Sequence, residues 1–419
     1  MSLLVKNVIL NNEKKDIYIK EKRIEKIGKS LNYKVKEKID GKGRKAILPG
    51  LVNCHTHSSM IIFRGYGDDL PLKEWLEEKI WPLEAKLTKE DIYWGTKLAC
   101  LEMIKTGTTC FNDMYWHLGH PEITIKAIQE MGLRAVIGFT ILDAMAEGTK
   151  ETITELYGKF KNKHSDLITF SIAPHSIYTV SKENLIWAKD FARKNNLLLH
   201  IHLSETEKEV EDCQKKYGLR PVEFLEEIGF LGENTVLAHS VFLSEKEIEI
   251  LGKRKCSVVN NPVSNLKLGT GAIFPYKSFK EAGVDICLGT DSAVSNNNLD
   301  LFEEMKFAAL LQKFREKNPA QVKAKEIVEV ATRNGAEALK IDAGEIKEGK
   351  LADFILIDLN QLCLCPGLNF YSDLVYSASG NCVSDMICNG NLIMRERKVK
   401  GEEEIMEKAF SLSRKLTGI

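Results

Sequence analysis

The chain has 419 residues, of which 44% are hydrophobic and 28% are charged; this supplies a large core and excludes wholesale disorder. The 59 basic and 59 acidic residues cancel, so no overall field favours nucleic acid or an anionic membrane as a partner. No apolar stretch approaches the ~20 residues that span a bilayer, the N-terminus lacks a signal segment, and the ten cysteines form no C-x-x-C pair. We therefore expect a cytoplasmic protein with reduced thiols.

Both ends of the chain carry strand patterns. Near the N-terminus, period-two alternation predicts short antiparallel strands at Leu4–Leu10, Asp16–Lys20 and Arg23–Ile27. Near the other end, Gly344–Asp358 has the pattern of a turn that leads into a buried strand, and Val383–Met394 that of a hairpin with an Asn-Gly turn. We expect the two ends to form one small β-sandwich, with a C-terminal helix after the last strand.

The middle of the chain alternates between strand and helix patterns. The predicted strands are Leu48–Cys54, Thr108–Asp113, Leu133–Leu142, Ile168–Ala173, Leu197–Leu203, Thr235–His239, Ser257–Asn260 and Asp285–Gly289. Helical periodicity lies between them, as at Lys89–Thr106, Ser181–Lys194, Pro221–Ile228, Ser244–Gly252 and Asp300–Lys317. Eight such units predict an α/β fold with a (β/α)₈ barrel over residues 49–340, flanked by sandwich segments 1–48 and 341–419.

Polar residues follow several of these strands. His55 and His57 end the first apolar run, and side chains two apart on a strand point the same way, so both imidazoles can converge on one ion. Later strands end in His202 with Glu205, in His239, and in Gly289-Thr290-Asp291. All of them lie at the carboxyl ends of their strands, where this barrel places its chemistry. The pattern predicts a catalytic metal site.

Four of these residues make a plausible ligand set. His55, His57, His202 and Asp291 supply three neutral nitrogens and one carboxylate, which leaves room for one water whose pKa falls towards ~7. We expect one divalent ion, with Zn²⁺ favoured and Fe²⁺ also suited to these ligands. His200 faces the same way as His202, but His202 lies nearer the strand end, so we expect His200 to be a core histidine.

Glu205 and His239 are candidates for proton chemistry. Glu205 follows His202 where the strand opens into a loop, so its carboxyl could carry protons between the activated water and a substrate nitrogen. The alternative for Glu205 is an ordinary surface glutamate. His239 could be a ligand or could orient the water; because four ligands are already supplied, we favour the orienting role.

These residues carry a family resemblance. The matching segments are Pro49 to His57, Trp75 through Pro82 to Glu84, Ala173-Pro174-His175-Ser176, His202 to Thr206, Ala238-His239-Ser240, Gly289 to Ser292 with Ser295-Asn296-Asn297, and Gly349 to Asp353. In this order and over nearly the whole chain, the sequence resembles the amidohydrolase superfamily. Within it, the chain is similar to 5′-methylthioadenosine/S-adenosylhomocysteine deaminases and to archaeal 5′-deoxyadenosine deaminases.

The resemblance implies a metal-dependent hydrolase that deaminates C6 of the adenine ring in 5′-modified adenosines, giving the inosine analogue and ammonia. In that reaction Glu205 protonates a ring nitrogen, while His239 and Asp291 handle the attacking hydroxide. The implied substrate contacts, besides Glu205 and Asp291, are Trp75 over the nucleoside, Glu84 on the ribose hydroxyls, His175 on purine or ribose and Ser295 at the base edge. Trp75 could instead be a core-facing aromatic, and Glu84 an ordinary helix-start residue. The partner is then a small-molecule nucleoside, and the enzyme a homo-oligomer, either a dimer or a tetramer.

One departure from the family bears on the substrate. Members that use S-adenosylhomocysteine carry arginines after the third strand that can grip the amino-acid tail. Here Phe139 takes the place of one, and Asp143–Lys150 offers only Lys150, which lacks the bidentate fork of arginine. We therefore expect better use of 5′-deoxyadenosine or 5′-methylthioadenosine than of S-adenosylhomocysteine or adenosine.

Several rival functions are weaker. The P-C-x-x-C string that cytidine-type deaminases require together with H-x-E is absent, as is H-E-x-x-H of zincin proteases. His175 occupies the region where a binuclear relative would need a bridging lysine, which favours one metal. The remaining alternatives are a mononuclear relative acting on guanine or a chlorinated triazine, and a metal-free scaffold protein. We expect His117 and His120 to lie in a loop after the second barrel strand.

Overall fold

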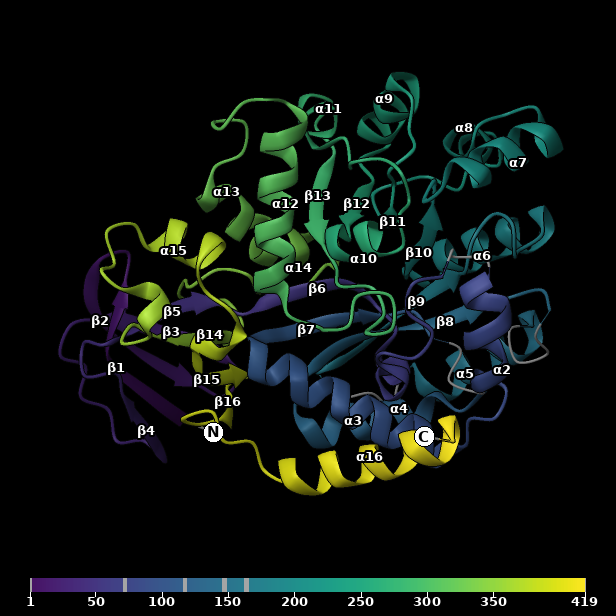
Figure 1. Cartoon of the computed structure of the whole chain (residues 1–419). Helices are drawn as coiled ribbons and strands as arrows, with labels where there is room; N and C mark the ends of the chain where they lie inside the picture. The colour runs from purple at the N-terminus through teal and green to yellow at the C-terminus, as the bar shows by residue number, and fades with distance from the viewer. Residues whose placement is uncertain (1, 71–73, 116–118, 145–148, 162–165, 419) are drawn as a thin grey trace.

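The computed structural model describes residues 2–70, 74–115, 119–144, 149–161 and 166–418. Its centre is a sheet of eight parallel strands whose spatial order follows the sequence (Figure 1). They are β6 (Leu51–Thr56), β7 (Thr108–Asp113), β8 (Arg134–Ile141), β9 (Ile168–Pro174), β10 (Leu198–Leu203), β11 (Thr235–His239), β12 (Ser257–Asn260) and β13 (Asp285–Leu288). A parallel bridge pairs Thr56 with Asp291, and the Asp291 amide donates to the His55 carbonyl at 2.9 Å. The first strand thus meets the last, which confirms the predicted barrel.

Helices follow the barrel strands, and most of them cover the outside of the barrel (Figure 1). They are α3 (Lys89–Thr106), α4 (Pro121–Met131), α5 (Lys150–Phe160), α6 (Lys182–Asn195), α7 (Glu207–Tyr217), α8 (Pro221–Glu227), α9 (Glu245–Arg254), α10 (Pro262–Lys267), α11 (Tyr276–Glu281), α12 (Leu301–Arg315), α13 (Ala324–Glu329) and α14 (Gly335–Ala338). The α3 helix has the predicted bounds because local signals set both ends. Thr88 and Asp91 form a capping box at its start, and Gly107 ends it in the left-handed conformation, with φ of 94°.

The two ends of the chain build a second, mixed sheet, as predicted (Figure 1). Its strands are β1 (Ser2–Leu10), β2 (Glu13–Lys20), β3 (Arg23–Gly28), β4 (Glu37–Asp40), β5 (Lys45–Pro49), β14 (Phe354–Asp358), β15 (Val383–Cys388) and β16 (Asn391–Met394). A register shift between Val5 and Val8 lets β1 pair with β4 in its first half and with β5 in its second. The division at residues 48/49 and 340/341 stays a prediction.

One predicted strand is wrong in its bounds. The run Leu48–Cys54 is not one strand, because the chain changes sheets at Gly50: β5 ends at Pro49 and β6 begins at Leu51. A Cβ on Gly50 would lie only 2.0 Å from Thr109 Oγ1, so the close approach of β7 requires glycine here. The apolar run hides this change because its residues are buried in both sheets.

The barrel interior carries its own small core beneath the strand ends. Seven strands contribute Val52, Cys54, Cys110, Val136, Leu198, Val236, Val259 and Cys287 to one buried cluster. Side chains from so many strands can meet only inside a barrel, since its outer faces diverge. Ala336 and Ala338 of α14 join this cluster. The strand ends that carry the histidines are therefore supported from below by packed apolar side chains.

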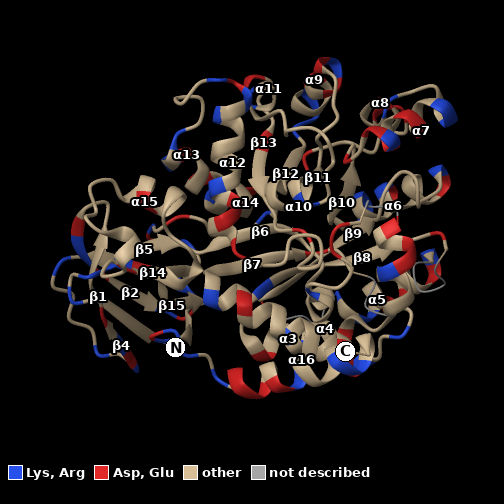
Figure 2. Ribbon diagram, viewed as in Figure 1, with Lys and Arg blue, Asp and Glu red and all other residues tan. Residues whose placement is uncertain are grey.

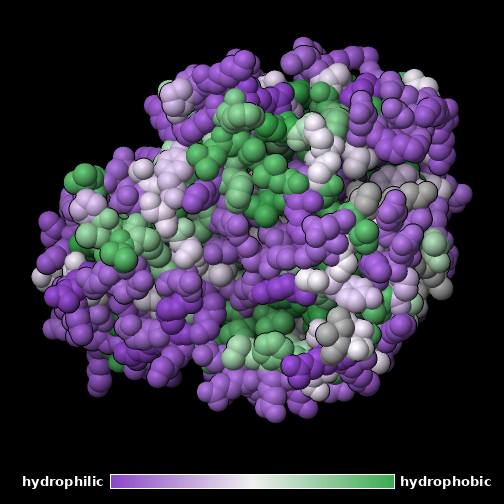
Figure 3. Space-filling view, viewed as in Figure 1, coloured by the Kyte–Doolittle hydropathy of each residue, from purple (hydrophilic) through white to green (hydrophobic). Residues whose placement is uncertain are grey.

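The remaining elements are short helices and the C-terminal helix. They are η1 (Ser58–Phe63), η2 (Trp75–Ile80), α2 (Trp81–Glu84), η5 (Val330–Asn334), η6 (Leu362–Leu364), α15 (Phe370–Tyr376), η7 (Gly380–Cys382) and α16 (Glu402–Thr417), which lies along α3. Charges of both signs alternate over the outer helices in Figure 2. An apolar area covers α12 in Figure 3, where Leu310 and Phe314 are exposed. In the described ranges, no helix combines the length and apolar character that a membrane crossing requires.

Candidate active site

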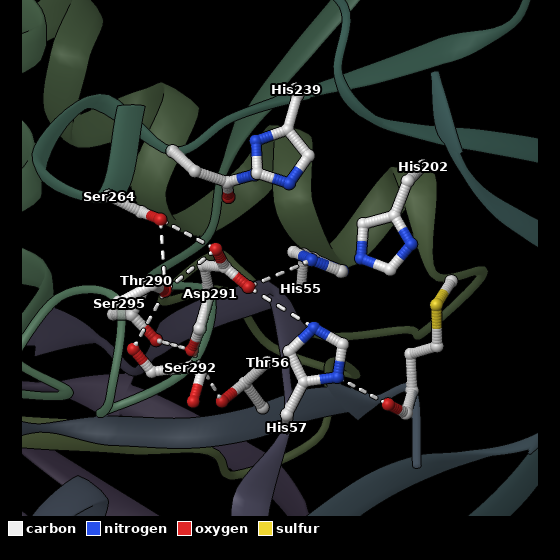
Figure 4. Close-up of polar contacts among 12 residues, drawn as sticks. His55, Thr56, His57, His202, His239, Ser264, Thr290, Asp291, Ser292 and Ser295 are labelled. Carbon is white, nitrogen blue, oxygen red and sulfur yellow. Dashed lines mark hydrogen bonds and ion pairs between the residues drawn. The ribbon is translucent and has the colours of Figure 1, made fainter. Parts of the chain in front are cut away.

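Four histidines and one aspartate converge at the carboxyl ends of the barrel strands (Figure 4). Donor atoms of His55, His202, His239 and Asp291 all lie within 4.8 Å of one another. His57 Nε2 lies 3.1 Å from Asp291 Oδ1, so its ring borders the same centre. The side chains come from β6 and the residue after it, from β10 and β11, and from the segment after β13. The fold thus brings together all four proposed ligands and His239.

Hydrogen bonds set the tautomers of three of these histidines. The Nδ1 of each ring donates to an oxygen: His57 to Met114 O at 2.5 Å, His202 to His175 O at 2.7 Å, and His239 to Asn265 Oδ1 at 2.8 Å. A neutral imidazole that donates from Nδ1 keeps the lone pair on Nε2. The fold therefore fixes three of the nitrogens in the state that a metal ion or a water proton requires.

His55 is held differently. Its buried Nε2 has no hydrogen-bond partner among the described residues and lies 3.3 Å from Asp291 Oδ1. Its Nδ1 lies 3.1 Å from His200 Nε2, and the other nitrogen of His200 lies 2.9 Å from Asn112 Nδ2. Both nitrogens of His200 are thus occupied within the barrel. The structure places His202, and not His200, in the cluster.

Asp291 is fixed by hydrogen bonds on one side and by imidazoles on the other. Its Oδ2 accepts from Ser264 Oγ at 2.6 Å and from Ser295 Oγ at 2.9 Å, while Oδ1 faces His55 and His57. Burial disfavours the charged form, but the two imidazoles close to Oδ1 outweigh it and hold the pKa of Asp291 well below its usual range. The centre therefore contains a fixed anion.

This donor set fits a divalent metal ion. Imidazole nitrogens and one carboxylate are the ligands that zinc and iron prefer, and the orphaned His55 Nε2 is a buried donor atom that an ion would satisfy. Four of the five groups suffice for a catalytic site that keeps one open position. The ligand set His55, His57, His202 and Asp291 stays a prediction, and His239 supplies a further inward-facing nitrogen.

The cluster forms the floor of a cavity of about 650 Å³. The described residues that line it include every substrate contact implied by the sequence, namely Trp75, Glu84, His175, Glu205, Asp291 and Ser295. A cavity of this size suits a small ligand of nucleoside class. Apolar walls with a few convergent polar groups are typical of such sites.

Glu205 stands at the edge of the cluster. Its side chain is buried, and Oε1 lies 3.9 Å from His239 Nδ1. Burial raises the pKa of Glu205, and the neighbouring His239 only partly offsets this. A carboxyl whose pKa is raised towards neutrality can both accept and return a proton. Beside His202, burial lowers the pKa of His175 to about 3, so this ring is neutral.

Glu84 and Trp75 also line the cavity. Glu84 ends α2, and Tyr115 Oη donates to its Oε1 at 2.8 Å. Burial raises the pKa of Glu84 to about 7, although the bond from Tyr115 lowers it. Trp75 begins η2 and is only 6% exposed. Ser295 differs from its implied role in one respect: its hydroxyl donates to Asp291.

Three residues of this site are absent from the candidates that the sequence indicates. Ser264 and Asn265 both come from α10, where one bonds Asp291 and the other His239. The run Asn260-Asn261-Pro262-Val263-Ser264-Asn265 directly after β12 is a signal that could have found them, since polar residues at that position face the active end of a barrel. Tyr115, which bonds Glu84, follows β7 by two residues and so has the same positional signal.

Phe139 is not among the residues that line the cavity, and its replacement of an arginine stays a prediction. It lies on β8 with its ring stacked on Phe170 at 5.3 Å and edge-on to Tyr157 at 6.4 Å, away from the cavity. Thr140 and Leu142 line the cavity instead, because alternate residues of a strand face opposite sides. Lys150 pairs with Glu183 at 2.6 Å. His120 contacts Glu122, and His117 lies outside the described residues.

Known proteins share both the sequence and the fold. Residues 46–393 match the model of the amidohydrolase family. A 5-methylthioadenosine/S-adenosylhomocysteine deaminase of Thermococcus sibiricus is 47% identical, covering 94% of each chain. A 5′-deoxyadenosine deaminase of Methanoregula boonei is 44% identical over 99% of this chain and 95% of its own.

A solved structure agrees with them. The adenosine deaminase from Xanthomonas campestris with bound zinc superposes with a TM-score of 0.93 at 30% identity, covering 100% of this chain and 99% of that one. The sequence match, the barrel and the cluster at its mouth all lead to one assignment. The chain belongs to the amidohydrolase family.

Proposed function

We propose that this protein is a metal-dependent deaminase that hydrolyses the C6 amino group of 5′-modified adenosines and releases ammonia and the inosine analogue. The curated relatives named above, at 44% and 47% identity over nearly the whole chain, are named as enzymes of this class. The observation that carries the proposal is that Glu205 and Glu84 line the same cavity as the histidine–aspartate cluster. One acid stands beside the reacting centre, and the other stands where a ribose can be held.

The proposed chemistry divides among the side chains. Zn²⁺, the metal that we favour, would supply a nucleophile at neutral pH by lowering the pKa of water when held by His55, His57, His202 and Asp291. Glu205 protonates the ring nitrogen beside C6, which makes that carbon electrophilic. His239 holds the attacking water, with its Nδ1 fixed by Asn265. Asp291, held ionised, accepts a proton from that water and passes it towards the leaving amine.

The cavity wall supports a neutral 5′ group. Four carboxyl groups line the cavity, those of Glu84, Asp143, Glu205 and Asp291. Among the described residues, Lys216 is the only Lys or Arg in the lining. A carboxylate tail on the ligand would meet no guanidinium there and would be repelled by the acids. Leu142, Ala144 and Val180 offer apolar contacts instead. We infer a preference for 5′-deoxyadenosine and 5′-methylthioadenosine over S-adenosylhomocysteine and adenosine.

A panel of adenine nucleosides varied only at the 5′ position tests the function. We expect ammonia release and loss of the adenine absorbance with all four compounds. The kcat/KM for S-adenosylhomocysteine should be lower than that for 5′-deoxyadenosine by about tenfold or more, which is the worth of one missing charge-assisted hydrogen bond. No ammonia from any member would contradict the deaminase assignment. A preference for S-adenosylhomocysteine would contradict only the inferred specificity.

Replacing Tyr115 with Phe tests the role of Glu84. The ionised carboxylate accepts two hydrogen bonds from a vicinal diol, so binding weakens as pH falls through the Glu84 pKa of about 7. Removing the Tyr115 donor disfavours the charged form, which moves the acidic limb of the kcat/KM profile to higher pH. At pH 7 we expect kcat/KM to fall by about 10- to 100-fold, mainly through KM.

The matched control is Tyr93→Phe. Tyr93 also donates to a glutamate, Glu130 at 2.5 Å, but it does not line the cavity. This variant should leave the pH profile unchanged. If Tyr115→Phe moved neither KM nor the acidic limb, the assignment of Glu84 to the ribose would be wrong.

We further propose that the enzyme self-associates, as a dimer or a tetramer. The apolar area over α12, with Phe314 79% exposed, is a surface feature that isolated monomers rarely present (Figure 3). Sedimentation tests this: we expect the wild-type protein to sediment as an oligomer and Phe314→Ser to shift towards the monomer. A monomer at micromolar concentration would contradict this part of the proposal.

A further inference from the structure

We infer that Glu209 is a positioning residue that fixes the proton-transferring Glu205; the inference rests on the proposed function. Glu209 lies in the first turn of α7, and its side chain is buried. Its Oε1 accepts from the Ser204 amide at 2.9 Å, and its Oε2 accepts from the Glu205 amide, also at 2.9 Å. Both carboxyl oxygens therefore hold the backbone from which the Glu205 side chain projects.

The held segment needs this support. Ser204 has φ of 49°, in the left-handed region that residues other than glycine rarely adopt. This turn takes the chain out of β10 and directs Glu205 into the cavity. The Ser204 carbonyl also accepts from the amides of Val241 at 3.0 Å and Phe242 at 2.9 Å, just after β11. Fixing Ser204 therefore fixes Glu205 relative to His239, which ends β11.

The contact departs from ordinary helix capping. In α9, Ser244 is the capping residue and Glu247, three residues later, accepts from the Ser244 amide at 2.8 Å. In α7, Thr206 caps the Glu209 amide in the same way. Glu209, however, reaches past Thr206 to the two preceding amides. An ordinary capping box would be sufficient to stabilise the start of α7. The longer reach of Glu209 instead holds the loop residues Ser204 and Glu205.

The burial of Glu209 argues in the same direction. In the described ranges no Lys or Arg pairs with it, and burial raises its pKa to about 7 despite the two amide bonds. A buried carboxyl without a cation costs stability, and such costs are found where a residue serves function. The two hydrogen bonds from the Ser204 and Glu205 amides offset part of this loss of stability. An error of about 1 Å in the placement of a reacting group lowers rates by about 10²-fold.

Glu209→Gln tests the inference. Glutamine has the same shape but offers one acceptor, so one of the two amides would face an NH₂ group. We expect kcat for 5′-deoxyadenosine to fall by about 10²-fold, with KM and bound metal within twofold of wild type. The control is Glu207→Gln, which removes an exposed charge from the same helix turn and should leave kcat within twofold. Wild-type kcat in Glu209→Gln, or failure of this variant to fold and bind metal, would overturn the inference.

A second measurement separates positioning from general support of the site. In the Glu205→Ala background, the Kd for 5′-deoxyadenosine is measured by calorimetry with and without Glu209→Gln. If Glu209 acts only through Glu205, the two Kd values agree within twofold. A Kd at least tenfold weaker in the double variant would show that Glu209 shapes the whole cavity and would overturn the inference. The proposed function is tested separately, by turnover of the wild-type enzyme.

Discussion

Replacing Glu205 with Gln is expected to lower kcat for 5′-deoxyadenosine by about 10³-fold, the usual worth of one general acid–base group. Glu205 is buried beside His239, and burial raises its pKa, which favours uptake of a proton by this carboxyl. The amide that replaces it has nearly the same shape but cannot carry this proton. Ammonia release gives the rate, and metal analysis of the same sample gives the metal content, which should equal that of wild type.

The paired measurement makes this prediction specific. Because Glu205 is not among the proposed ligands, loss of metal together with activity would mean that it supports the metal centre and not proton transfer. Activity within tenfold of wild type would also contradict the assignment. Glu207→Gln, on the exposed side of α7, again serves as the unaffected control.

Loss of the metal ion is expected to abolish deamination and to be reversed by adding Zn²⁺ or Fe²⁺. The ion contributes several kcal/mol to the reaction, so variants that cannot hold it should lose more than about 10³-fold in kcat/KM. We expect His57→Ala and Asp291→Asn to fall into this class. The first loses an inward-facing nitrogen, and the second loses the fixed anion that contacts both His55 and His57.

His239→Ala distinguishes the ligands from the group that handles water. Its nitrogen also faces the cluster, but we expect this variant to retain metal while losing most of its rate. His120→Asn, which changes a histidine paired with Glu122 outside the cavity, should keep both metal and rate. If His239→Ala lost metal and His57→Ala kept it, the two histidines would exchange their proposed roles.

The barrel is predictable because its signals are local. The strands Thr108–Asp113, Thr235–His239 and Ser257–Asn260 have the bounds that the sequence predicts. Each is a short apolar run bounded by turn residues or by a helix start, and such a pattern needs no knowledge of distant contacts. The Asn389-Gly390 hairpin is equally local, since both residues adopt positive φ. The change of sheets at Gly50 is not predictable, because it depends on distant pairing partners: β5 pairs with β14, and β6 pairs with β7.

In the site, too, local sequence signals indicate some features and distant contacts determine the others. Residue types and their places at strand ends are sufficient to indicate His55, His57, His202, Glu205, His239 and Asp291. They do not indicate how each side chain is held. Ser264 lies 27 residues from Asp291, and Tyr115 lies 31 residues from Glu84, so no local pattern links them. The direction of the Phe139 side chain is likewise not predictable, because β8 is buried throughout and its sequence pattern does not indicate which face turns inward.

By itself, the sequence determined which residues end the barrel strands and therefore which donors and acids meet at the mouth of the barrel. The physical reason is that parallel strands of one barrel bring their carboxyl ends to one place, independently of the conformation of the loops. Tertiary structure alone decided the tautomer of each histidine, the ionisation of Asp291 and the anchoring of Glu205 by Glu209. Those properties depend on hydrogen bonds and burial supplied by other elements, such as α10 and α7, whose approach is fixed only when the whole barrel packs.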